Sequence, residues 1–340
     1  MRKFIVAFPT LLLMLALLGV SGCGEKTTAD LAGVQDLLTL IPEKATGIFA
    51  MNLQRITQLD IFKEQMEKVK TGQMETEKES FKDYLEFIDQ TGIDPEKDLK
   101  TMVVAMFDSL DMRGDVGKDF AAVIALNYDK EKILNFIREK GEKYETEEYQ
   151  GQMLYKIKSR KGEDITLSFF NTKVIVLGNQ KNIESIIDLE QKGGKNILDN
   201  SRLKPFLGQL KANTLMSFVF DFPENLKEAQ PQGAPFKMDL SKAEILHGFI
   251  NYENLAWSGE IKLISKDEES NKQIVNLLNG LKGMAVLAGP EVAELVSNIN
   301  LTSSADNIKL TFSISDELVK KLQKKVKEKS SGFMQPTETE

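Results

Sequence analysis

The sequence contains one cysteine, one histidine and one tryptophan among its 340 residues. A single cysteine excludes an internal disulfide and a cysteine-based metal cage. A single histidine excludes every site that needs two imidazoles, including the zinc site of His-Glu-x-x-His hydrolases. The formal net charge is −7, whereas proteins that bind nucleic acid usually carry a basic surplus. We therefore expect no metal, no cofactor and no nucleic acid as ligands.

Long apolar runs are equally scarce, and the longest lies at the start of the chain. Arg2 and Lys3 precede an uncharged run of 17 residues, Phe4–Val20. This run is short for a spanning helix, which needs about 20 apolar residues. A basic start, a short apolar core and the small residues that follow are typical of an export signal. We predict that residues 1–22 are a signal peptide.

Val20-Ser21-Gly22-Cys23 ends this segment and resembles the bacterial lipobox. The resemblance implies that the Cys23 thiol receives a diacylglyceryl group, that a peptidase cuts before Cys23, and that the new amino terminus is acylated. Membrane lipid would then be the partner of Cys23, because two or three acyl chains anchor a protein stably where one does not. The resemblance thus places the protein in the bacterial cell envelope, on the extracytoplasmic side. Since Gly24 stands where an inner-membrane retention signal has Asp, it also implies the periplasmic face of the outer membrane in a Gram-negative source.

The predicted tether, residues 23–30, is short and polar. Its first part, Gly24–Thr28, has the sequence Gly-Glu-Lys-Thr-Thr. Five residues reach at most ~17 Å when fully extended. We therefore expect the folded body to lie against the bilayer.

The rest of the chain alternates between helical and strand periodicities, which predicts an α+β fold of mostly antiparallel sheet with helices packed on one face. Two similar lobes are expected, at 31–200 and 201–329, followed by a disordered tail at 330–340. Tyr128–Glu131 and Lys266–Glu269 follow strands at corresponding places, which suggests an internal duplication. The pattern resembles secreted bacterial proteins with duplicated strand–helix units, many of which begin with a step like Leu40-Ile41-Pro42. That resemblance implies no catalytic residues.

The predicted elements follow from apolar spacing and from cap and turn residues. Strands are predicted at 48–53, 102–107, 120–126, 144–149, 153–157, 165–170, 174–177, 215–222, 245–250, 255–264, 299–302 and 308–314. Helices are predicted at 31–41, 56–69, 76–91, 182–191, 201–210, 265–288 and 316–329, and two more are predicted to begin at Asp129 and at Pro290. The segment 223–239 contains three prolines and is predicted to be a loop.

Two patterns imitate known sites. Ser201 and Lys204 match the Ser-x-x-Lys of penicillin-recognising serine enzymes, but the Lys70-Thr71-Gly72 partner precedes them when it should follow. Ser201 is therefore interpreted as a helix N-cap. Asp94, Glu96 and Asp98 alternate as in a calcium loop, but the glycine and glutamate that such a loop requires are missing. An acid-rich turn before a strand is the better interpretation, and no catalytic residue is predicted.

His247 and Trp257 lie in apolar strands, and we expect both to pack within the sheet. The helix from Ile274 to Ala288 contains Gly280 and Gly283, which suits either a buried helix or the wall of a cleft. In the last helix, lysines follow Asp316 and Glu317. This order complements the helix dipole and would also allow contact with anionic lipid head groups.

The sequence thus predicts a non-enzymatic, lipid-anchored protein that binds an envelope protein partner or supports assembly. The first alternative is a carrier or sensor of an apolar ligand held between the two lobes. A less favoured alternative is an envelope hydrolase.

Overall fold

The structure is a computed structural model that describes residues 33–71, 78–108, 119–140, 143–158, 164–210, 213–227 and 239–332. The predicted signal peptide, Cys23 and the tether lie outside these residues, as does most of the predicted C-terminal tail. The last helix continues through Gly332, so it includes the first three residues that were assigned to the tail.

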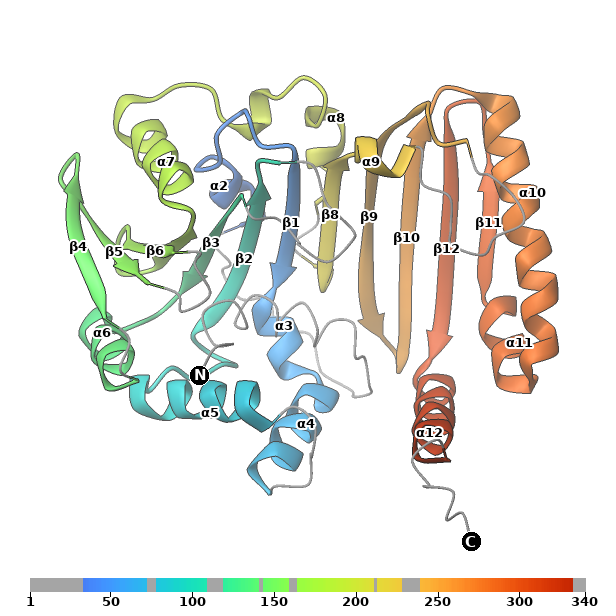
Figure 1. Ribbon diagram of the computed structural model, residues 1–340, viewed down its shortest axis with the longest axis horizontal. Coiled ribbons are helices and arrows are strands. Elements are labelled where there is room, and N and C mark those ends of the chain that lie inside the picture. Colours follow the sequence, from blue (N-terminus) through green and yellow to red (C-terminus); the bar gives the residue numbers. More distant parts are fainter. Residues whose placement is uncertain are drawn as a thin grey trace, which may run out of the picture.

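One twelve-stranded sheet runs through the molecule (Figure 1). Every strand pairing in it is antiparallel, which confirms the predicted α+β fold with an antiparallel sheet. The strands are β1 (Gly47–Asn52), β2 (Leu99–Met106), β3 (Phe120–Leu126), β4 (Tyr144–Tyr149), β5 (Gln152–Ile157), β6 (Ile165–Phe169), β7 (Val174–Gly178), β8 (Met216–Asp221), β9 (Ala243–Glu253), β10 (Ala256–Ser265), β11 (Ile299–Ser303) and β12 (Asn307–Ser315).

Helices and short helical turns connect the strands. They are α2 (Val34–Leu38), α3 (Leu53–Gln58), α4 (Asp60–Lys70), α5 (Lys78–Thr91), α6 (Lys130–Glu139), α7 (Gln180–Lys192), η1 (Ile197–Asp199), α8 (Lys204–Leu207), α9 (Glu224–Lys227), α10 (Glu268–Ala285), η2 (Val286–Ala288), α11 (Pro290–Ser297) and α12 (Asp316–Gly332). The helix predicted at 56–69 is divided, because Leu59 leaves the helical conformation between α3 and α4. Asp129 caps α6 as predicted, since its carboxylate accepts hydrogen bonds from the backbone N–H groups of Glu131 and Lys132.

The two halves of the chain share the one sheet. The strand order is β11-β12-β10-β9-β8-β1-β2-β3-β7-β6-β5-β4. Strand β8 of the C-terminal half pairs with β1 of the N-terminal half, with Phe49 opposite Phe218. The two expected lobes are therefore not separate in the sheet, because one continuous sheet contains strands of both halves. The pairing has a physical reason: each of these strands would otherwise expose a row of unpaired backbone groups at an edge.

The N-terminal strands are buried on both faces. One face, called here the α5 face, carries Met51, Met102 and Ile124 and is covered by α3, α4, α5 and α6. The other, the α7 face, carries Ile48 and Val103 and is covered by α2, α7, η1 and α8. The expectation of helices on one face is wrong for this half. Its strands β2 and β3 are nearly continuous apolar runs, and such runs require cover on both sides.

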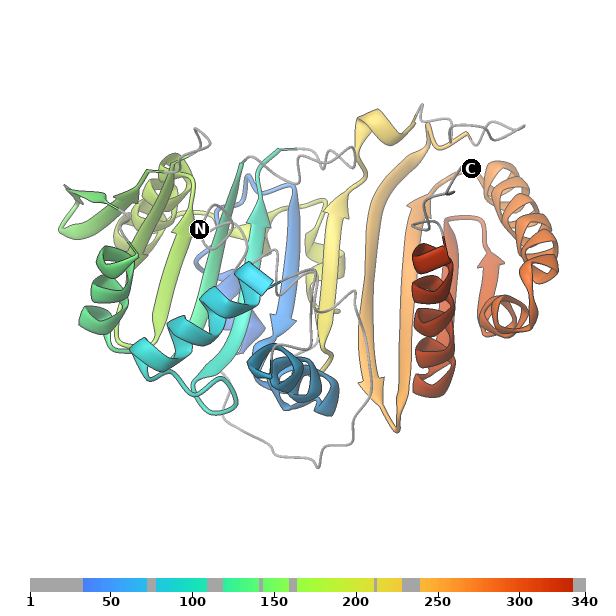
Figure 2. The ribbon, with the colours of Figure 1, turned by 60° about the horizontal axis from the view of Figure 1, so that its bottom comes forward.

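The C-terminal strands have one covered face. Strand β10 alternates Trp257, Ile261 and Leu263 on the α5 face with Glu260 and Lys262 on the α7 face. Helices α10 and α12 pack on the α5 face of this half, and Figure 2 shows α12 lying across it. Here the one-sided arrangement is confirmed. Helix α11 contacts α10 and α12 and has no buried residue among the positions that the structure describes.

Phenylalanine rings lie over glycines at three places in the sheet, and the Gly47–Phe220 pair is at the β1/β8 junction of the halves. Gly47 is directly opposite Phe220, Gly248 is opposite Phe218, and Gly259 is opposite Phe312. A Cβ atom on Gly47 would lie 2.1 Å from the Phe220 ring, so the ring occupies the space that a side chain would need. Aromatic rings that cover strand glycines in this way support a bent sheet.

Candidate functional site

A cavity of about 420 Å³ lies on the α5 face, between α4, α5 and the turn that leads into β2. Its lining combines apolar side chains from the two helices with a comparable share of polar and charged side chains. The lining residues are Thr57, Phe62, Lys63, Met66, Glu67, Lys70, Tyr84, Leu85, Ile88, Asp89, Asp94, Pro95 and Glu96. A volume of this size is within the range of small-molecule sites, about 300–1,000 Å³.

The apolar walls come from two helices that face each other. Phe62 and Met66 lie one turn apart on α4, and Tyr84 lies on α5. All three are buried, and the Phe62 and Tyr84 rings meet edge to face with centroids 6.3 Å apart. Burial raises the pKa of the Tyr84 phenol above its ordinary value. The phenol therefore stays neutral at physiological pH and can donate a hydrogen bond.

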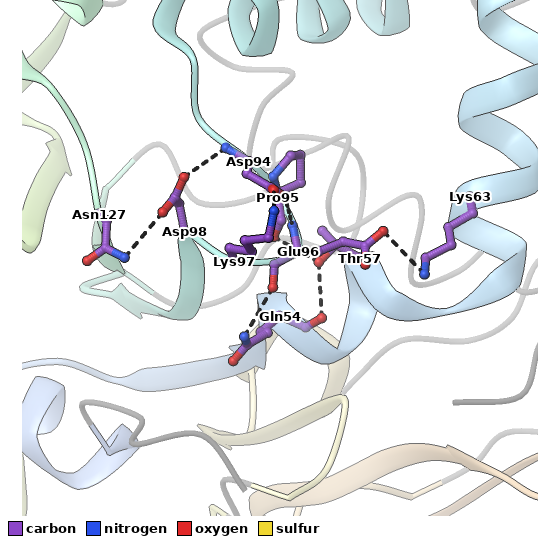
Figure 3. Close-up of polar contacts among 9 residues, drawn as sticks. All are labelled: Gln54, Thr57, Lys63, Asp94, Pro95, Glu96, Lys97, Asp98 and Asn127. Atoms are coloured by element: carbon purple, nitrogen blue, oxygen red, sulfur yellow. Dashed lines mark hydrogen bonds and ion pairs between the residues drawn. The ribbon is translucent and has the colours of Figure 1, made fainter. Parts of the chain in front are cut away.

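The turn at Ile93–Asp98 is held by its own carboxylates (Figure 3). The Asp94 carboxylate accepts a hydrogen bond from the Glu96 N–H at 3.0 Å, and the Asp98 carboxylate accepts one from the Asp94 N–H at 2.8 Å. Lys97 lies 2.5 Å from the Asp94 carboxylate and, with these N–H donors, holds the pKa of that group below its usual range. These contacts confirm the predicted acid-rich turn before a strand.

Helices α3 and α4 fix this turn in place. The Thr57 hydroxyl donates to the Pro95 carbonyl at 3.0 Å, and the Gln54 amide donates to the Glu96 carbonyl at 3.1 Å. Lys63 pairs with the Glu96 carboxylate at 3.2 Å, as Figure 3 shows. One rim of the cavity is therefore attached to the helix that forms its wall. The arrangement brings apolar side chains together with cationic and anionic groups in one cavity.

The cavity is a feature that the sequence analysis missed. Asp94 and Glu96 were predicted only as part of an acid-rich turn. The apolar residues on α4 and α5 have the ordinary spacing of core-facing helices. The local sequence is the same whether two such helices pack tightly or leave a cavity between them. The difference depends on how the two helices are placed in the fold.

The serine and lysine considered as a catalytic pair lie before and at the start of α8: Ser201 lies in a turn, and Lys204 is the first residue of the helix. The capping role predicted for Ser201 belongs to Asn200, whose side chain accepts hydrogen bonds from the N–H groups of Arg202 and Leu203, both at 3.0 Å. The Ser201 prediction is therefore wrong by one residue.

His247 and Trp257 pack in the sheet as expected. His247 is 4% exposed on the α7 face, and its ring lies 4.8 Å from that of Phe206. Burial lowers the pKa of His247, so its imidazole is neutral at physiological pH. Trp257 lies on the α5 face with its ring 4.9 Å from that of Tyr252. Neither residue lines the cavity.

Two searches of the described ranges give negative results. Their His, Cys, Asp and Glu side chains form no group of three or more that could hold a metal ion. The helices within those ranges also lack the combined length and apolar character needed to cross a membrane.

The fold and the cavity together define an α+β protein built on one antiparallel sheet, with a small site of mixed apolar and charged lining beside it. The chain belongs to the family described as "Protein of unknown function (DUF3352)", whose model matches residues 10–327.

Among solved structures, the chain is similar to crystal form IV of TP0453 from Treponema, with a TM-score of 0.45 and 11% identity over 86% of this chain and 97% of that one. The chain is also similar to crystal form III of TP0453, with a TM-score of 0.42 and 10% identity over 86% of this chain and 97% of that one. A search of curated proteins finds no match to the sequence.

Proposed function

We propose that the protein is a non-enzymatic lipoprotein of the bacterial cell envelope that binds an envelope partner or supports assembly. The observation that carries the proposal is Val20-Ser21-Gly22-Cys23 directly after a short apolar run. Acylated Cys23 holds the body on the extracytoplasmic side of a membrane, and the short tether keeps it close to the lipid surface. In a Gram-negative source that surface is the periplasmic face of the outer membrane.

Replacement of the cysteine tests the anchor directly. Cys23→Ala should abolish incorporation of labelled palmitate and leave an uncleaved precursor, whereas Thr27→Ala should be processed and fractionate like the natural protein. Membrane retention of a cleaved, unlabelled Cys23→Ala protein would refute the proposal. Crosslinking in intact cells should then recover one reproducible envelope protein, and a cleaved, acylated chain without such a partner would refute only the binding role.

The strand order supports the finer proposal of an internal duplication. Outward from the β1/β8 pair, one half reads β1-β2-β3-β7-β6 and the other reads β8-β9-β10-β12-β11. Helix α6 follows β3, and α10 follows β10, so helices also occupy matching places. In this proposal, the β4–β5 hairpin is an addition to the N-terminal copy. The domain boundaries at residues 200 and 201 would then separate the two copies.

The cavity favours a second candidate function, the carriage or sensing of an apolar ligand. The original expectation placed that ligand between the lobes, but Phe49, Phe218 and Phe220 pack against one another at the junction. The cavity beside α4 and α5 offers a space of about 420 Å³ in another place, and Phe62, Met66 and Ile88 are among its lining residues. A ligand with an acyl or aromatic part and a charged end would match its walls and rim.

A cavity-filling variant tests this second candidate. Ile88 lines the cavity, whereas Gln90 lies on α5 outside it and is exposed. Binding of radiolabelled palmitate should be lost in Ile88→Trp and retained in Gln90→Trp. Equal binding by both variants, or no binding by the natural chain, would exclude this cavity as a fatty-acid site.

A further inference from the structure

The turn between α10 and α11 exposes its apolar side chains to solvent. Leu287 is 87% exposed, Met284 is 59% exposed and Val286 is 46% exposed. Five large apolar residues are exposed in the part of the chain that the structure describes, and three of them lie together at the end of α10 and in the turn that follows it. We call Gly283–Pro290 the apolar tip. Its eight residues carry no charge, so water surrounds a concentrated apolar surface.

The apolar tip projects away from the sheet. Helix α10 packs on the sheet through its first half, where Ile274 and Val275 are buried. Buried residues are absent from η2 and α11 over their described lengths. Figure 1 shows the far end of α10, with α11 beside it, at the margin of the molecule. The tip is therefore a protruding helical turn, in contrast to the concave surfaces that bind small molecules.

The cationic end of α12 lies beside the apolar tip. Lys325 of α12 pairs with Glu291 of α11, and its Nζ lies 3.7 Å from the place that a Cβ atom on Gly289 would occupy. Since Lys325 meets the start of α11, the acids Asp316 and Glu317 at the other end of α12 are remote from the tip. Residues 320–329 include six lysines and one glutamate. The molecule as a whole carries a charge of −7, whereas this stretch has a surplus of lysine. Three of these lysines form ion pairs: Lys320 with Asp316, Lys321 with Glu317, and Lys325 with Glu291.

We propose that the apolar tip inserts into the interface of an anionic lipid bilayer, with the lysines of α12 on the neighbouring phosphates. Apolar side chains at a helix end, flanked by lysines, match the two layers of that interface. The acyl layer of a bilayer is fluid, so it can accept a convex apolar turn without a preformed complementary surface. The lysines match the negative head groups of the same bilayer. The contact goes beyond the acyl anchor because it requires no lipid on Cys23.

Flotation with lipid vesicles tests this proposal. The probe is the chain from Gly24 onward, which retains every described residue and lacks Cys23. It should float with vesicles of phosphatidylethanolamine and phosphatidylglycerol and bind less to vesicles of phosphatidylcholine. Leu287→Asp should lower the partition coefficient by about tenfold or more, because burial of one leucine contributes at least that factor.

Leu255 provides a matched control for the same substitution. It is 50% exposed in the β9–β10 turn, and its carbonyl accepts a hydrogen bond from the Asp316 N–H at the opposite end of α12. Leu255→Asp changes the charge equally and should float like the natural chain. Circular dichroism of both variants establishes that they are folded.

A depth probe separates insertion from adsorption. The chain from Gly24 onward has no cysteine, so Leu287→Cys and Leu255→Cys each accept one environment-sensitive fluorophore. Vesicles should shift the emission to the blue at position 287 only. Equal responses at both positions would overturn the proposal, as would unchanged flotation of Leu287→Asp. So would a dimer in sedimentation that Leu287→Asp dissociates, because a second copy would then cover the tip. Loss of acylation in cells would leave this proposal standing.

Discussion

Asp316 is a buried acid at the start of α12. It is 6% exposed, and burial raises its pKa although Lys320 lies 3.8 Å away. A carboxyl group whose folded pKa is raised favours folding below its unfolded pKa, near pH 4, and loses that contribution as the pH rises. Taken by itself, Asp316 therefore makes the free energy of unfolding decrease as the pH rises from acid toward neutral.

We predict that Asp316→Asn removes this pH dependence. The free energy of unfolding of the variant should increase relative to the natural chain from about pH 4 upward, because the amide stays neutral. Urea titrations at several pH values provide the measurement. Asp306→Asn is the control with the opposite sign, since hydrogen bonds from Ser304 and Asn307 lower the pKa of Asp306. An Asp316→Asn difference that stays constant with pH would contradict the prediction.

At the scale of elements, one lysine joins α5 to α6. Lys140, at the end of α6, lies 3.1 Å from the Asp83 carboxylate and also pairs with Glu86. Burial opposes its charge, but the two carboxylates outweigh this and raise the pKa of Lys140. The side chains of Lys140 and Asp83 are 16% and 11% exposed. Removal of one partner from such a site destabilises the fold, because the remaining charge has neither its partner nor full contact with water.

We predict that Lys140→Met destabilises the protein by about 3 kcal/mol, since it leaves Asp83 and Glu86 without their cation. Lys192→Met is the control. Its partner Asp188 lies on the solvated side of α7, and the side chains of the pair are 59% and 40% exposed, so the expected loss is about 0.5 kcal/mol. Chemical denaturation measures both. Similar losses for the two variants would show that Lys140 does not act as a buried partner.

The sequence predicted most elements because their local signals agree. Strand β3 has the predicted bounds, Phe120–Leu126, and Asp129 is a correct N-cap. Two predicted helix starts were wrong for a shared reason. Ser265, the first residue of the helix predicted at 265–288, belongs to the end of β10, and Asp267 caps α10. In the same way, Asn200 makes the hydrogen bonds expected of Ser201. Where two residues that can cap a helix lie close together, the sequence does not show which of them makes the capping hydrogen bonds. The position of the chain that leads into the helix decides between the two residues.

Long-range features could not be predicted in the same way. The apolar runs of β2 and β3 indicate two covered faces, but nothing in β1 or β8 alone indicates that they pair with each other. The cavity combines α4, α5 and the turn at Asp94–Glu96, and its volume depends on the separation of two helices. The exposure of Leu287 could not be predicted either, because the apolar spacing around it suits a buried helix as well as an exposed one.

For the whole molecule, the shared sheet predicts that both halves unfold together. One apolar cluster extends from Tyr155 through Met102 to Trp257, across the β1/β8 pair. Met102 is fully buried in the N-terminal half, whereas Trp257, the chain's single tryptophan, reports on the C-terminal half. Destabilisation of either half should therefore reach the other.

We predict that Met102→Ala lowers stability by about 3 kcal/mol and moves the unfolding midpoint seen by Trp257 fluorescence together with that seen by far-UV circular dichroism. Met153→Ala, at a residue that is 37% exposed, should shift neither by much. A Trp257 transition that keeps its natural midpoint in Met102→Ala would show that the C-terminal half unfolds separately despite the shared sheet.

The Phe220 ring above Gly47 has a consequence for how this family can vary. Since the two positions share one volume, a residue larger than glycine at position 47 can be accommodated only when the ring at position 220 is reduced. Homologous chains should therefore change these positions jointly, which would make this seam between the two halves recognisable from an alignment alone.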